Sequence, residues 1–224
     1  MQKYDINNPP LVPTRIIDNF LTEEEADEIV AFMDSRPEET LGKSYYMDNQ
    51  VESIITNLTI NSNLSEKIKL KMHGVFGPDL NIAEMHGLLA VIPYRMHTDG
   101  IYGEYGIDDL NYGAYTVVIP LETCNSHTII FDQYYAKTKG IQDWISEFNP
   151  PVLNKITEEE IEKYFTNEVP QHLKYLSIET IFPFKKGSLL AASRYKFHCS
   201  DNFHKNGVQT KKALIMWCSL PFKS

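Results

Sequence analysis

Residues 87–99, GLLAVIPYRMHTD, decide how the rest of the chain is interpreted. An apolar run with β-forming residues leads directly into the pair His97 and Asp99. If the strand reaches this point, its alternation sends the two side chains to the same face. A histidine and a carboxylate on one face could hold a metal ion, although an HxD pair alone also occurs in solvated turns.

The surrounding sequence predicts more strands of the same kind. Short β-rich runs, separated by Gly, Asn, Asp and Pro, occupy residues 114–122, 127–133, 179–184, 187–193 and 211–220. Their spacing predicts an antiparallel sandwich or barrel. Upstream, a short strand leads into a helix with Thr22 as N-cap and Glu25 completing a capping box, and a second helix is expected from Ser65 to about His73.

These elements predict one domain over residues 1–224. Residues 1–84 form an amino-terminal helical support, and residues 85–224 form a β core with an insertion at 133–177 that contains a capped helix. A connection of this length in a compact domain is usually functional or mobile, so it is expected to act as a substrate lid.

Composition limits the possible partners. The 30 acidic and 21 basic residues give a net charge of -9, which disfavours nucleic acid and anionic lipid as partners. No run approaches the roughly 18 apolar residues of a membrane span, and the amino terminus lacks an apolar signal region. The expected location is therefore the cytoplasm, while the oligomeric state stays open.

A third metal ligand is predicted farther along the chain. His198 follows the run that begins at Gly187 and is expected to end that strand. His204 competes with it, but lies in the polar turn of residues 201–207. Two histidines and one carboxylate form the facial set that leaves positions open on Fe(II).

With these ligands in this order, the chain resembles the Fe(II)- and 2-oxoglutarate-dependent oxygenases, specifically their prolyl-hydroxylase-like branch. Residues 94–99 are similar to the family's Tyr-x-x-His-x-Asp element, and residues 16–30 to its amino-terminal helix entry. Lys211, six residues before Trp217, matches the family's basic position. Three features depart from the pattern: a Tyr-x-x-Gly step is missing, lysine replaces the usual arginine, and the interval from His198 to Lys211 is longer than usual.

The resemblance implies a mostly β fold with flanking helices, namely a double-stranded β-helix of the jelly-roll or cupin-like type. It implies that His97, Asp99 and His198 hold Fe(II), with 2-oxoglutarate and O2 at the open positions and ascorbate in support. Lys211 would bind the distal carboxylate of 2-oxoglutarate, with Lys212 as its rival. Tyr94 and Thr128 would add hydrogen bonds.

The implied reaction is hydroxylation of a small molecule or prolyl peptide, with release of succinate and CO2. Substrate recognition is expected from residues 100–113 and from the insertion at 133–177. The alternative is a jelly-roll module without catalysis that binds a structural metal or a ligand.

Overall fold

The computed structural model describes residues 11–45, 50–99, 112–136 and 140–221. Its strands are β1 (Arg15–Ile17), β2 (Gly42–Tyr45), β3 (Val51–Asn57), β4 (Asn81–Ala90), β5 (Tyr112–Pro120), β6 (His127–Tyr134), β7 (Ile178–Pro183), β8 (Leu189–Ser193), β9 (Lys196–Ser200) and β10 (Lys211–Pro221). They form a seven-stranded sheet, in the order β1-β8-β5-β10-β4-β3-β2, and a three-stranded sheet, in the order β7-β6-β9. Neighbouring strands pair antiparallel.

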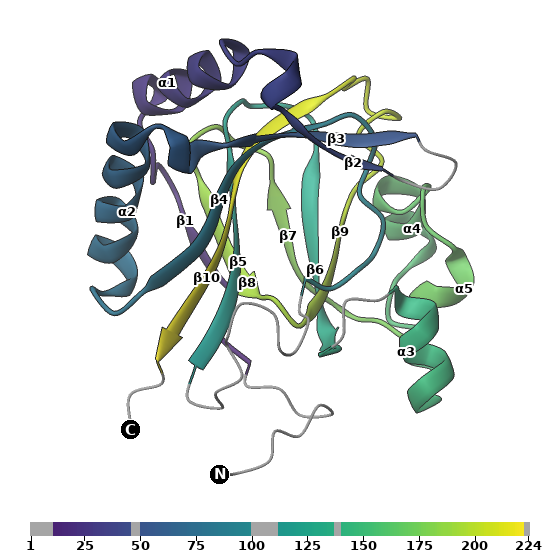
Figure 1. Cartoon of the computed structure of the whole chain (residues 1–224). Coiled ribbons are helices and arrows are strands. Elements are labelled where there is room, and N and C mark those ends of the chain that lie inside the picture. The colour runs from purple at the N-terminus through teal and green to yellow at the C-terminus, as the bar shows by residue number, and fades with distance from the viewer. Residues whose placement is uncertain (1–10, 46–49, 100–111, 137–139, 222–224) are drawn as a thin grey trace.

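The two sheets face each other across an interior that side chains of both sheets line (Figure 1). On β10, Lys211, Ala213 and Trp217 point into this interior, while Leu214 and Met216 pack into the opposite hydrophobic cluster. Successive side chains of a strand alternate between faces, so this register follows from the sequence. The predicted jelly-roll fold is confirmed.

Two helices cover the outer face of the larger sheet, α1 (Glu23–Asp34) and α2 (Ser62–Phe76) (Figure 1). The predicted capping box is present, because Thr22 accepts from the Glu25 backbone and Glu25 accepts from the Thr22 backbone. Gly87 of β4 lets α1 approach closely: a Cβ atom there would lie 2.6 Å from Sδ of Met33. No helix in the described ranges is long and apolar enough to span a membrane.

In its described residues, the insertion forms a packed layer of three helices beside the smaller sheet: α3 (Ile141–Phe148), α4 (Glu158–Tyr164) and α5 (Pro170–Leu173) (Figure 1). Buried Phe165 and Leu176 join a cluster with Phe131 of β6 and Phe197 of β9. Among the described residues, none from the insertion lines the interior cavity. The structure thus gives this segment a buried packing role, and its motion as a lid stays a prediction.

Three expectations need correction. Besides the short strand that was predicted before the first helix, which is β1, residues before 85 supply β2 and β3, so more of the sheet comes from this region than predicted. The run from Gly187 to His198 is two strands, β8 and β9, separated by Arg194 and Tyr195, so the chain passes from one sheet to the other there. Helix α2 extends beyond both predicted ends. The expected recognition segment 100–113 lies outside the described residues except where β5 begins.

Candidate metal centre

The HxD pair lies in the segment that follows β4. That strand ends at Ala90, so strand alternation does not place His97 and Asp99 as predicted. A short antiparallel bridge holds the segment instead: the His97 N–H donates to the His198 carbonyl at 3.0 Å, and the His198 N–H donates to the His97 carbonyl at 2.9 Å. His198 lies in the middle of β9 rather than at a strand end.

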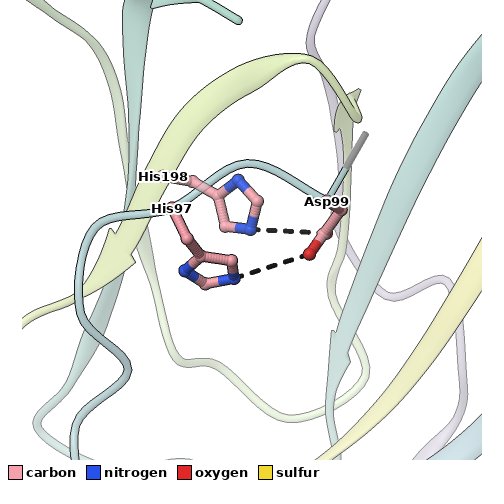
Figure 2. Close-up of side chains that lie close together, drawn as sticks. All are labelled: His97, Asp99 and His198. Atoms are coloured by element: carbon pink, nitrogen blue, oxygen red, sulfur yellow. Dashed lines mark ion pairs between the residues drawn. The ribbon is translucent and has the colours of Figure 1, made fainter. Parts of the chain in front are cut away.

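This bridge brings the three predicted ligands together. One possible ligand atom from each of His97, Asp99 and His198 lies within 4.8 Å of the others. The Asp99 carboxylate faces both rings from one side, with Oδ1 3.5 Å from Nε2 of His97 and Oδ2 3.4 Å from Nε2 of His198 (Figure 2). The three groups therefore converge on one point.

The ring orientations fit a metal ion. Nδ1 of His97 lies 2.6 Å from the Arg95 carbonyl, and Nδ1 of His198 lies 3.1 Å from the Lys196 carbonyl. With the proton on Nδ1, each ring donates to a backbone carbonyl and presents the lone pair of Nε2. Metal-binding histidines usually have such a partner on the other nitrogen, so the donor set suits a divalent ion.

Asp99 is held by its neighbours. The Thr116 hydroxyl donates to its Oδ2 at 2.6 Å, and the Arg194 guanidinium donates to its backbone carbonyl at 2.7 Å. Burial would raise the pKa of Asp99, but His198 and His97 outweigh it and hold the pKa well below the usual value. The carboxylate is therefore ionised at neutral pH.

The three groups line a cavity of about 530 Å³ between the sheets. Lys211 lies at one end of it, 6% exposed, and its Nζ donates to the hydroxyls of Ser200 at 2.6 Å and Ser126 at 3.2 Å. Burial lowers the pKa of Lys211 to about 8. Among the described residues no carboxylate forms an ion pair with this amine, so it can meet an incoming anion.

Of the other predicted residues, two line the cavity and two do not. Thr128 and Tyr94 line the same cavity, and the Tyr94 hydroxyl donates to Ser53 at 2.5 Å. Lys212 lies on the other face of β10, where Nζ is 2.7 Å from Asp34. His204 is not among the lining residues, and its Nε2 lies 2.9 Å from the Val91 carbonyl.

No protein-family model matches the chain, and no curated protein matches it in sequence. Solved structures do match. The non-heme alpha ketoglutarate dependent epimerase SnoN from nogalamycin biosynthesis is 11% identical, with 93% of this chain and 78% of that chain covered and a TM-score of 0.58. HygX from Streptomyces hygroscopicus, with nickel and 2-oxoglutarate bound, is 12% identical over 93% and 82% of the two chains, with a TM-score of 0.55.

The carbocyclase SnoK, also from nogalamycin biosynthesis, is 12% identical over 92% of this chain and 79% of its own, with a TM-score of 0.55. This chain has the fold of the 2-oxoglutarate-dependent non-haem enzymes. At these identities the likeness establishes the fold and not the reaction. The prolyl-hydroxylase-like branch stays a prediction.

Several residues that line or support this cavity were not predicted from the sequence. Ser126 and Ser200 hold Lys211, and Glu84 and His86 of β4 line the opposite end. Trp217 also lines the cavity. Its alternation with Lys211 on β10 was the available signal, since both residues face the same way.

Glu168, in the connection between α4 and α5, links the insertion to the HxD segment. Its carboxylate accepts the Met96 N–H at 2.8 Å, next to His97, and burial raises its pKa to about 7. Glu168→Ala leaves this N–H without its acceptor and is expected to lower the free energy of unfolding by about 1–3 kcal/mol. Glu168→Gln keeps a carbonyl acceptor and is the matched control in denaturant titrations.

The raised pKa of Glu168 predicts how the stability of the fold changes with pH. Because the folded-state pKa of Glu168 is raised, its contribution to stability is lost as pH rises through about 7. The unmodified protein should therefore lose stability relative to Glu168→Gln as the pH rises from about 4.5 to about 7, and the difference between the two proteins should be level above that pKa. A constant difference between the two proteins across this range would contradict the assignment.

Proposed function

We propose that the chain is an Fe(II)- and 2-oxoglutarate-dependent oxygenase that hydroxylates its substrate and releases succinate and CO2. The observation that carries the proposal is the convergence of His97, Asp99, His198 and the buried amine of Lys211 on one cavity. Solved structures of the same fold support it, because SnoN is described in complex with Fe3+ and alpha ketoglutarate and EvdO2 with 2-oxoglutarate. The proposal takes residues 1–224 as one domain.

The two histidines and Asp99 would hold Fe(II), which with 2-oxoglutarate and O2 supplies the oxidising chemistry. The protein's own groups bind and orient. Lys211 would bind the distal carboxylate of 2-oxoglutarate through a charge-assisted hydrogen bond, with its ammonium directed by Ser126 and Ser200. Thr128, opposite Ser200 on β6, would donate a further hydrogen bond.

Succinate release tests the proposal. Purified protein with Fe(II), 2-oxoglutarate and ascorbate is expected to form succinate slowly alone and faster with a substrate from a panel of small molecules and prolyl peptides. Asp99→Ala removes one ligand and is expected to remove iron-dependent turnover. If the protein binds Fe(II) and 2-oxoglutarate but forms no succinate with any compound, it is a binding module instead. Product analysis separates hydroxylation from epimerisation or ring closure.

A further inference from the structure

The cavity has a second polar end, away from Lys211. On β4 and β10, Ala90 pairs with Lys211 at one end of the cavity, and Glu84 pairs with Trp217 at the other. Both Glu84 and Trp217 line the cavity, as does His86 between them and the centre. Trp217 is six positions after Lys211 on the strand, which is about 20 Å at the rise of an extended chain.

The candidate metal centre lies between these two ends. Ser200, which accepts from Lys211, is two residues from His198 on β9. At the other side Thr116, which donates to Asp99, is the β5 partner of Trp217. A five-carbon diacid that binds both the metal and Lys211 would therefore leave the end at Glu84 and Trp217 empty.

Glu84 gives this end a negative charge. Its Oε2 lies 2.5 Å from Nε2 of His86, and the described residues provide no hydrogen bond to its Oε1. The Glu84 side chain is 28% exposed. Apart from Asp99, it is the only carboxylate among the described lining residues.

His86 holds the Glu84 carboxylate in place. Its Nδ1 is buried and has no hydrogen-bond partner in the described part of the chain. With Nε2 as the donor, His86 forms a hydrogen bond to Oε2 of Glu84 and fixes the carboxylate.

The walls beside Glu84 are apolar. Trp217 lies within the same end, and Leu88, Ile215 and Val118 continue the lining toward the centre. The Arg194 guanidinium already lies over the Trp217 indole, 5.7 Å from the ring centroid, so at this end the indole buries apolar surface and the Glu84 carboxylate attracts the cation. The net charge of -9 also favours the approach of cations over anions.

We propose that the end formed by Glu84, His86 and Trp217, called the amine subsite below, binds the protonated amine of a small-molecule substrate whose apolar ring or chain lies along the cavity wall. This inference deepens the proposed function and rests on it, since it makes the amine subsite the substrate end of the oxygenase pocket. Among the small molecules and prolyl peptides considered as substrates, the inference favours small molecules that carry an amine.

Matched pairs of probes test the amine subsite at pH 7. The protein is loaded with Mn(II) and 2-oxoglutarate, and the affinities of 2-phenylethylamine and cyclohexylmethylamine are compared with those of 2-phenylethanol and cyclohexylmethanol by ligand-observed NMR. The amines are expected to bind about tenfold more tightly or better, the range of a charged hydrogen bond. Mn(II) should broaden their signals when they bind beside it.

Two variants complete the experiment. Glu84→Gln keeps the shape of the side chain and should remove the preference for amines, while Mn(II) and 2-oxoglutarate still bind in calorimetry. Glu66→Gln removes the same charge from exposed α2 and should keep the preference. Equal binding of amines and alcohols, no binding by any probe, or an unchanged preference in Glu84→Gln would overturn the inference. If the unmodified protein fails to bind Mn(II) or 2-oxoglutarate, this result would instead refute the proposed function.

Discussion

Replacing His198 by alanine is expected to weaken binding of Fe(II), or of Mn(II) as a surrogate, by at least about 100-fold. Loss of groups that merely orient metal ligands costs 10- to 100-fold, so loss of a ligand should cost more. The Nε2 atom of His198 lies 3.4 Å from Asp99, within the group that could hold a metal. Calorimetric titration of the metal into the purified variant measures the effect.

His204→Ala is the matched control. This histidine is six residues away, and its ring lies near the backbone carbonyls of Val91 and Gln209 rather than in the cavity. Its removal should leave metal affinity unchanged. Metal binding that survives in His198→Ala and disappears in His204→Ala would show that the distal ligand has been assigned to the wrong residue.

Lys211→Ala is expected to weaken 2-oxoglutarate binding by roughly 30-fold or more while sparing the metal. Removing one partner of a buried charge pair costs about 2–5 kcal/mol. Lys212→Ala should have little effect, because Lys212 lies on the opposite face of β10 and pairs with Asp34. Titration of 2-oxoglutarate into each Mn(II)-loaded variant shows which of the two lysines contributes more to its affinity. If neither variant loses affinity, the cosubstrate assignment is wrong.

The lowered pKa of Lys211 also predicts how the affinity for 2-oxoglutarate changes with pH. With the pKa of Lys211 lowered to about 8, the amine is charged below this pH and loses its proton above it. Affinity for 2-oxoglutarate should therefore be level up to about pH 7.5 and fall as the pH rises through 8. Lys211→Arg keeps its charge throughout and should lack this fall if the larger side chain binds at all. A level profile in the unmodified protein would show that the charge of Lys211 does not contribute.

Strand alternation accounts for much of what could be predicted from the sequence. In β10 it places Lys211 on the cavity side and Lys212 on the outer side, because one face must pack against the helices. The helix cap at Thr22 follows from local hydrogen bonding alone and was also predicted. Such features depend on residues that are close together in the chain, so they can be predicted from the sequence.

Features that depend on contacts between distant segments could not be predicted in this way. The chain leaves β8 at Ser193 and enters β9 of the other sheet at Lys196, without a glycine or proline to mark the change. Ser126 and Ser200 reach Lys211 only because β6 and β9 pair. Glu84 lies on the cavity side of β4, but its spacing alone does not distinguish this from an outward position.

The backbone bridge between His97 and His198 has a consequence for metal selection. Two main-chain hydrogen bonds join the segments that carry the ligands, so the donor atoms are assembled when the chain folds. Such preorganisation allows metal exchange without unfolding. Two imidazoles and a carboxylate should then follow the Irving–Williams order, with nickel and copper bound more tightly than iron. Iron occupancy would therefore be decided by which ions the cell supplies.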